Sequence, residues 1–263
     1  MKHGNTGRQK GKAARYQQQA LLPGDFMPVP RPRPSVKPLE PLTLAQAALI
    51  NALDVYDLIF ATGEFGTGKT YVPSATAADA LLAGTIDKIY ITRPNIGCEE
   101  EYGFLPGELD EKVAPWAQPV IDVLIERMGA GHVEYLLKVK KIEIAPLGML
   151  RGRTFKDCFV ILDEAQNTTP KQMKLFLSRI GENCKMVVDG DLEQCDLPAG
   201  AESGLRDGME KMLGHSWVVH VNFGIDDIVR SGNARDVCLA YSTKKGHPVG
   251  QAELGRFLGH RPH

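Results

Sequence analysis

Residues 63–70 read GEFGTGKT, a glycine-rich stretch that matches the phosphate-binding pattern GxxxxGK[ST]. The apolar run DLIFAT (57–62) precedes it, and YVPSATAADALLAG (71–84) follows it as an expected helix with Pro73 in its first turn. A strand, a loop and a helix in this order are what the pattern requires. The candidate nucleotide-binding residues of this loop are Gly63, Glu64, Phe65, Gly66, Thr67, Gly68, Lys69 and Thr70.

The residue types of this loop suit phosphate. Its glycines allow backbone N–H groups to converge on phosphate oxygens, and the start of a helix adds partial positive charge. Lys69 would contact the β- and γ-phosphates, and the Thr70 hydroxyl would coordinate Mg²⁺. The alternative is a glycine turn with a solvated lysine, which the strand and helix on either side disfavour.

A phosphate loop needs an acidic partner on a neighbouring strand. In FVILDEA (159–165), four apolar residues place Asp163 at the carboxyl end of a buried strand, where ligand sites of α/β sheets lie. We expect Asp163 to hold Mg²⁺ and Glu164 to act as general base for the attacking water. The alternative is that the two acids only cap the next helix.

A third polar element follows in VVDGDLEQ (187–194), where Asp191 and Gln194 come just after another apolar strand. In a parallel sheet this strand end would lie beside the acidic one. Gln194 is therefore a candidate to sense the γ-phosphate or orient the water, and a plain polar turn is the alternative.

Strands and helices alternate through the middle of the chain. Strands are expected at 57–62, 87–94, 140–147, 157–166, 184–191 and 216–223. Helices are expected after a Thr43 cap, at 71–84, within 106–131, at 169–181 with Gly181 as the stop, and at 226–241. This order predicts an α/β fold with a mostly parallel sheet covered by helices on both faces.

The chain ends differ from this middle part. Residues 1–38 carry eight lysines and arginines against one aspartate, although the whole chain has a net charge of −1. We predict a basic, proline-rich flexible arm at 1–42, one ATPase domain at 43–241 and a loose tail at 242–263. The arm would suit a phosphate backbone, and a solvated tail without a partner is the alternative.

Composition excludes several classes of protein. No run approaches ~20 apolar residues, and the basic N-terminus lacks the apolar core of a signal peptide. The five cysteines are scattered, which argues for reduced thiols and against a zinc site or a disulfide framework. These features predict a cytoplasmic protein.

Together the motifs resemble the PhoH-like ATPases, which are related to the core of superfamily 1 helicases. GEFGTGKT, ITRP, GFLPGELDEKV, RGRTF, FVILDEAQNTTPKQMKLFLSRIG, KMVVDGDLEQCDLP and SGLRD occur in the family's order, between residues 38 and 241. The resemblance implies a three-layer, RecA-like P-loop NTPase fold that uses ATP and Mg²⁺.

The resemblance also implies roles for single residues. Lys69 and Thr70 match the Walker A pair, Asp163 and Glu164 the Walker B pair, and Gln194 the glutamine of helicase motif III.

Gln46 lies where related helicases place a glutamine that reads adenine, although a surface residue is the alternative.

Two positions depart from the family pattern. Asp189 stands where the family commonly has Thr, which places an extra carboxylate near the phosphate end. IVRSGNA (228–234) stands where the family usually reads VVRHPLV. Arg230 is retained and could serve as an arginine finger, with a solvated arginine as the alternative.

Related translocases bind nucleotide between two RecA-like domains, and only one is expected here. A neighbouring subunit would supply the second wall, and with it an Arg230, which predicts a ring and most simply a hexamer. Arg93, Arg151 and Arg153 are candidates for nucleic-acid contact, whereas arginines of this kind can also be solvated or paired with carboxylates. Aromatic residues make up only 7%, so backbone contact should outweigh base stacking.

The sequence therefore favours Mg²⁺-dependent ATP hydrolysis coupled to binding, translocation or unwinding of single-stranded RNA or DNA. An ATP-dependent ribonuclease ranks lower, because no second acidic cluster stands out. A nucleotide-switched binding module that recruits an RNA-processing partner is the remaining alternative.

Overall fold

A parallel sheet forms the centre of the molecule. The computed structural model describes residues 37–94 and 109–241, with only the backbone at 109–114. Within this part the sheet has six strands in the order β3-β2-β4-β5-β1-β6, and every pairing is parallel. The strands are β1 (Leu58–Gly63), β2 (Lys88–Thr92), β3 (Ile142–Ile144), β4 (Cys158–Leu162), β5 (Cys184–Gly190) and β6 (Val218–Phe223). The α/β fold with a mostly parallel sheet is thereby confirmed, whereas the proposed arm before residue 37, the tail after 241 and Cys98 lie outside the described residues.

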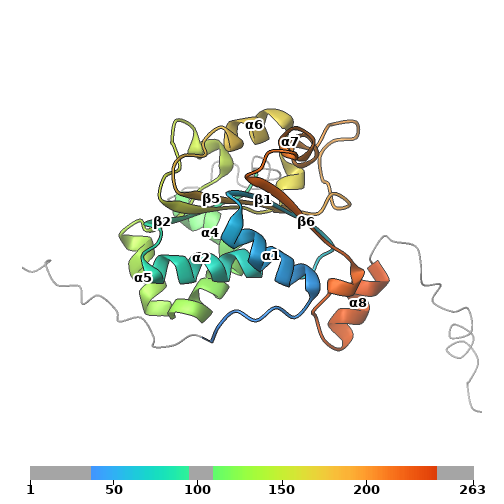
Figure 1. Ribbon diagram of the computed structural model, residues 1–263, viewed down its shortest axis with the longest axis horizontal. Coiled ribbons are helices and arrows are strands. Elements are labelled where there is room, and N and C mark those ends of the chain that lie inside the picture. Colours follow the sequence, from blue (N-terminus) through green and yellow to red (C-terminus); the bar gives the residue numbers. More distant parts are fainter. Residues whose placement is uncertain (1–36, 95–108, 242–263) are drawn as a thin grey trace, which may run out of the picture.

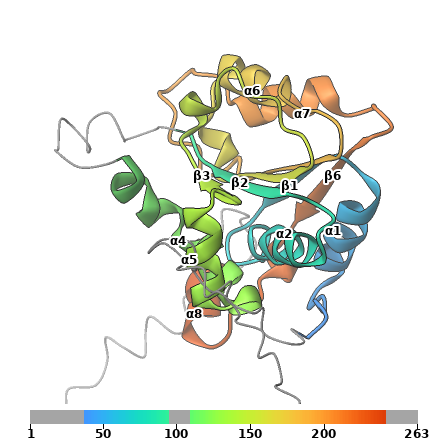
Figure 2. The same cartoon turned by 90° about the vertical axis from the view of Figure 1, so that its left-hand side faces the viewer.

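Helices cover both faces of the sheet, which gives three layers (Figures 1 and 2). One layer contains α1 (Leu44–Val55), α2 (Tyr71–Ala83), α4 (Leu109–Met128) and α5 (Ala130–Lys138), and α8 (Asn233–Tyr241) lies on the same side. The other layer contains α6 (Pro170–Leu177) and α7 (Gly204–Met212). Short 3-10 turns are η1 (Leu147–Leu150), η2 (Ala165–Asn167) and η3 (Ile225–Asp227). No helix in the described ranges is both long and apolar enough to cross a membrane.

Alternation along the central strands divides the core between the two faces. Ile161 and Val187 belong to the core on the α1–α2 side, whereas Val160 and Val188 belong to the core on the α6–α7 side. Burying each such side chain contributes about 1.5–3 kcal/mol. The two residues that continue the first set, Asp163 and Asp189, are therefore expected on the α1–α2 side, which is also the side of the phosphate loop.

The first predicted helix start is confirmed. α1 begins at Leu44, and the Thr43 hydroxyl accepts a hydrogen bond from the Gln46 backbone N–H at 3.2 Å. The chain is already attached before this point, because Leu39 packs against the core and Arg127 donates to the Lys37 carbonyl at 3.0 Å.

The last predicted helix is wrong in its first half. Of the predicted range 226–241, only Asn233–Tyr241 is α-helical. The Val229 N–H donates to the Gly66 carbonyl at 3.0 Å, and Ile228 is buried. These contacts hold residues 228–230 against the phosphate loop, and the helix begins only after them.

Two further helices were not predicted. The stretch around 106–131 ends in a break at Gly129, whose φ is +85°, and α5 follows. α7 contains two glycines, which weaken its helical signal. A Cβ on Gly208 would lie 2.9 Å from Met173 Cγ, so this glycine allows α6 and α7 to approach closely.

Candidate nucleotide-binding site

The glycine loop joins the end of β1 to the start of α2, as predicted. Gly63 has φ +124°, and a Cβ there would lie 1.9 Å from the Phe223 carbonyl oxygen of β6. Gly68 has φ +86°, and a Cβ there would lie 2.8 Å from Gln46 Nε2. Larger side chains are thus excluded by both backbone conformation and space. The loop is braced internally by the Thr67 hydroxyl, which donates to the Glu64 carbonyl at 2.8 Å.

Lys69 and Thr70 lie at the end of this loop, just before α2. Lys69 Nζ lies 3.4 Å from the Glu64 carbonyl oxygen, a long hydrogen bond that a phosphate could replace. The Thr70 side chain makes no capping bond to α2. A helix N-terminus with an ammonium and a hydroxyl beside it is an environment that suits phosphate and a divalent cation.

The predicted acids follow β4. Asp163 continues the ladder, since its N–H donates to the Thr92 carbonyl at 3.0 Å. Glu164 has φ +54° and ψ +39°, a left-handed conformation that costs a non-glycine residue about 1–3 kcal/mol. Such strain is tolerated where the surrounding contacts fix the residue, and it sets the direction of the Glu164 carboxylate.

The order of the strands corrects one expectation. The acidic strand β4 is not the immediate neighbour of β1, because β5 lies between them. The expectation that the end of β5 lies beside the acidic strand end is confirmed, since β4 and β5 pair along their length. Asp189, the residue that differs from the family pattern, lies on β5 opposite Ala61 of β1. It is therefore placed between the glycine loop and the acidic motif.

Asp189 is fully buried. Burial raises the pKa of its carboxyl well above the ordinary value, and the nearby Asp163 carboxylate raises it further, whereas Lys69 acts in the opposite direction. Among the described residues, neither of its carboxylate oxygens has a hydrogen-bond partner.

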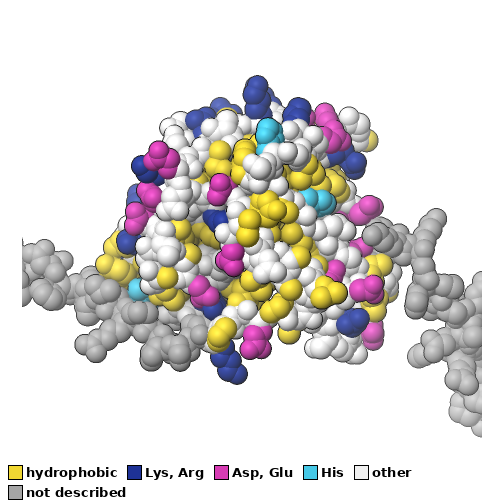
Figure 3. Space-filling model, viewed as in Figure 1, with side chains coloured by type: hydrophobic (Ala, Val, Ile, Leu, Met, Phe, Trp, Pro, Cys, Tyr) yellow, Lys and Arg dark blue, Asp and Glu magenta, His cyan; other side chains and the backbone are white. Residues whose placement is uncertain are grey.

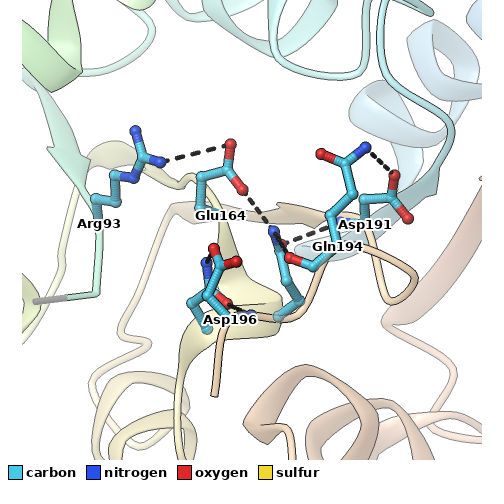
Figure 4. A network of polar contacts seen from close by, with 7 residues as sticks. Arg93, Glu164, Asp191, Gln194 and Asp196 are labelled. Atoms are coloured by element: carbon cyan, nitrogen blue, oxygen red, sulfur yellow. Dashed lines mark hydrogen bonds and ion pairs between the residues drawn. The ribbon is translucent and has the colours of Figure 1, made fainter. Parts of the chain in front are cut away.

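Gln166 connects the acidic strand to the loop after β5. Figure 4 shows Glu164, Asp191 and Gln194, the residues that it joins. Its Nε2 donates to Glu164 Oε2 and, at 3.3 Å, to the Gln194 carbonyl, while its Oε1 accepts from the Asp191 N–H at 3.0 Å. The Gln194 side chain in turn donates to Asp191 Oδ2 at 2.7 Å. Gln194 is thus joined to the candidate base through one buried side chain.

Sequence reasoning assigned no role to Gln166, although it lies within the quoted motif FVILDEAQ. The only signal was its position two residues after the general base. A Cβ on Gly190 would lie 2.5 Å from Gln166 Oε1. The absence of a side chain at Gly190 therefore leaves the space that the Gln166 side chain fills.

Arg93 follows β2 and extends toward the same place. Its Nη2 lies 3.6 Å from Glu164 Oε1, and each side chain is roughly one third exposed, at 35% and 37% (Figure 4). A candidate nucleic-acid residue is therefore paired with the candidate catalytic base.

Gln46 and Arg230 border a cavity of about 650 Å³ that Gly66 and Gly68 of the glycine loop also line. Gln46 is buried, and its Nε2 donates to the Thr67 carbonyl at 2.9 Å while its Oε1 accepts from the Leu42 N–H at 2.8 Å. A plain surface role is thereby excluded. Pro38 and Tyr71 also line this cavity, which gives it apolar and aromatic walls suited to a base.

Arg230 lies against the glycine loop of its own chain. A Cβ on Gly66 would lie 3.1 Å from Arg230 Cγ. The sequence predicted that a neighbouring subunit would supply this arginine to the nucleotide site. In this structure Arg230 approaches the glycine loop of its own subunit.

Arg151 and Arg153 lie elsewhere, after η1 near the β3 edge of the sheet. Arg153 forms an ion pair with Glu143 of β3, which also pairs with Lys88 at 3.1 Å. Although burial opposes the effect, these two cations lower the pKa of Glu143. Arg151 is exposed. The carboxylate-paired alternative thus applies to Arg153, and the arginine pair is not part of the glycine-loop site.

The charges on the surface are mixed. On the face shown in Figure 3, basic and acidic side chains are interspersed instead of forming one broad basic area. In the described part of the chain, no three His, Cys, Asp or Glu side chains form a group able to hold a metal ion. Thr70 and Asp163 nevertheless fit a Mg²⁺ that nucleotide phosphates help to coordinate, since such ions use only one or two carboxylates beside the phosphates.

Comparison with known proteins agrees with this arrangement. A family model described as PhoH-like protein matches residues 38–242. Protein PhoH of Escherichia coli strain K12 is 48% identical over 200 residues, which cover 75% of this chain and 56% of that protein. A PhoH-like protein of Bacillus subtilis strain 168 is 45% identical over 199 residues, covering 76% of this chain and 62% of that one. The chain thus spans less than two thirds of the length of these relatives.

Among solved structures, Pif1 helicase from Candida albicans aligns with a TM-score of 0.34 and 14% identity. The alignment covers 70% of this chain and 40% of that one. At that level it adds nothing to the family match.

Proposed function

The chain belongs to the family of PhoH-like proteins, and from this premise we propose that it hydrolyses ATP and couples the hydrolysis to single-stranded RNA or DNA. The observation that carries the hydrolysis is the meeting of two motifs at one edge of the sheet. Lys69 follows β1 through the glycine loop, Asp163 follows β4, and β5 with Asp189 lies between these two strands. This edge is where α/β sheets bind their ligands.

Each side chain has a role in this proposal. Lys69 and the N–H groups of the glycine loop bind the phosphates, and Thr70 and Asp163 hold Mg²⁺. The metal neutralises charge that develops on the phosphates. Glu164 takes the proton of the attacking water, and Gln166 holds the carboxylate in place. Gln46 and the cavity beside it accept the adenine base.

The contact between Arg93 and Glu164 supports coupling to nucleic acid. A partly exposed ion pair of this kind contributes only about 0–1 kcal/mol, so a nucleic-acid phosphate could compete for Arg93. Glu164 would then be released to accept a proton from water. Because the visible surface lacks a broad basic area, a few arginines would carry the contact, and the basic residues before position 37 could add salt-sensitive attraction.

ATP turnover with and without single-stranded RNA and DNA, across a salt series, tests this function. We expect nucleic acid to stimulate turnover, with the effect declining as salt rises. Lys69→Ala should lower turnover by about 100-fold or more, because it removes the positive charge that stabilises the transferring phosphoryl group. Wild-type turnover by Lys69→Ala would exclude the phosphate assignment. Unchanged turnover on adding nucleic acid, with partner capture only in the ATP state, would instead favour a nucleotide-switched binding module.

Arg93→Ala tests the coupling separately. We expect basal turnover to rise, because Glu164 is no longer restrained, and the stimulation ratio with nucleic acid to fall by about tenfold. Lys156→Ala is the matched control, since Lys156 is also exposed and paired, at 2.8 Å to Glu182. If Arg93→Ala keeps the full stimulation ratio, the ion pair has no part in coupling.

The assembly belongs to the same proposal. In this proposal the chain consists of an N-terminal arm at 1–42, a nucleotide-binding domain at 43–241 and a tail at 242–263. A neighbouring subunit of a ring, most simply a hexamer, would cover the nucleotide held by this domain.

A further inference from the structure

Asp189 has no structural role that its contacts explain. It lies on β5, the strand between the glycine loop and the acidic motif, and its side chain is fully buried. Both of its carboxylate oxygens lack a hydrogen-bond partner among the described residues. A buried polar group of this kind is unfavourable and rare in native proteins, and it can be satisfied either by a proton shared with the Asp163 carboxyl or by a bound cation.

The surroundings of Asp189 indicate which ligand. Its charged neighbours are Asp163, Lys69 and Glu164, which are the same groups that the proposed function places around the phosphates. In the register of the sheet, Asp189 lies opposite Ala61 of β1, and its neighbour Val188 lies opposite Leu162 of β4. Side chains alternate along a strand, so Asp189 lies on the same face of the sheet as Val187, which packs in the core on the α1–α2 side.

We propose that Asp189 is a second carboxylate of the divalent-cation site, and that it faces the metal brought in with the nucleotide beside Asp163. Carboxylate oxygens, directly or through a water molecule, are the ligands that Mg²⁺ and Mn²⁺ prefer. The assignment rests on the nucleotide function proposed above. Because no three such side chains in the described residues are arranged so that they could hold a metal ion by themselves, binding of the metal should require nucleotide.

The competing explanation is that Asp189 only packs against the residues around it and helps to hold the glycine loop in place, without contacting a metal. The two explanations differ in what happens when the charge is removed but the shape is kept. A packing residue would leave the metal affinity of Asp189→Asn unchanged. If Asp189 belongs to the metal site, Asp189→Asn should weaken metal binding without weakening the binding of nucleotide in the absence of metal.

The experiment measures free Mn²⁺ by electron paramagnetic resonance while the full chain is titrated in the presence of ADP. We expect Asp189→Asn to weaken nucleotide-dependent Mn²⁺ binding by about tenfold, comparable to the loss of a supporting residue at known metal sites. Asp226→Asn is the control, because it makes the same change of side chain at an exposed position in η3. Fluorescent ADP binding in EDTA should be equal or tighter in Asp189→Asn than in wild type.

Each outcome decides a separate point. Equal Mn²⁺ affinity in wild type and Asp189→Asn overturns the inference, while nucleotide binding by both keeps the proposed function. Absence of nucleotide binding in wild type overturns both. Thermal melting without metal reports whether the variant folds, and Asp189→Thr provides a second folded variant in which the same loss of Mn²⁺ affinity is expected.

Discussion

At the scale of single residues, the glycine loop depends on positions where a side chain has no room. Gly68→Ala would place a methyl group 2.8 Å from Gln46 Nε2 at a backbone φ of +86°. We expect it to disturb both the phosphate loop and the Gln46 contact, and to weaken nucleotide binding by about tenfold or more. Isothermal titration with ADP measures this change.

Gly131→Ala is the control for Gly68→Ala. Gly131 lies in α5, and nothing lies within 4 Å of a Cβ built there. The alanine should stabilise the fold by about 0.5–1 kcal/mol and leave ADP affinity unchanged. Equal ADP affinities in wild type and Gly68→Ala would show that the loop adapts to a side chain, contrary to the geometry described here.

At the scale of elements, β6 is joined to β1 by a contact that depends on pH. His220 Nε2 lies 2.6 Å from the Thr62 hydroxyl across the two strands. Burial lowers the pKa of His220, so the folded chain favours the neutral ring. The unfolded chain takes up a proton near the ordinary value of about 6.5, and stability should therefore fall as pH decreases from 6.5 through the lower folded pKa.

Urea unfolding of wild type and His220→Gln at pH 7.5, 6.5 and 5.5 measures this effect. We expect the variant to lose less stability than wild type between the first and last pH. His215→Gln, at an exposed position just before β6, should behave like wild type. Parallel loss of stability in wild type and His220→Gln would assign the acid sensitivity to other groups.

The sequence predicted those elements whose signals are local. Apolar runs located all six described strands, and Thr43 marked the start of α1. What it missed depends on distant contacts. Residues 228–230 are held by the glycine loop, and α7 contains glycines that serve packing against α6. The position of β5 between β1 and β4 depends on strand order, which no local pattern contains.

The candidate site shows the same division. The glycine loop, Asp163 and Glu164 are adjacent in sequence to strong strand signals, so they were predicted together. The Gln166 contacts to the loop after β5 and the Arg93 pair with Glu164 join separate strands, so only the folded chain reveals them.

At the scale of the whole molecule, the position of Arg230 bears on how a ring would work. This arginine contacts Gly66 of its own chain, and the backbone beside it is tied to the same residue by the Val229 N–H. An arginine held in this way can act on its own nucleotide. A neighbouring subunit would then serve to exclude water and close the open side, without supplying this charge.

Mixing two inactive variants separates action within a subunit from action between subunits. Arg230→Ala and Glu164→Gln should each reduce turnover by about 100-fold. If Arg230 acts within its own subunit, an equal mixture has no intact site and remains inactive. If it acts on a neighbour, turnover recovers in mixed rings. An interface between two unlike subunits can form in two orientations, and one of them joins an intact Arg230 to an intact Glu164. Because the contact with Gly66 is within one chain, we expect no recovery, and mass photometry of the mixture must show co-assembly for that result to stand.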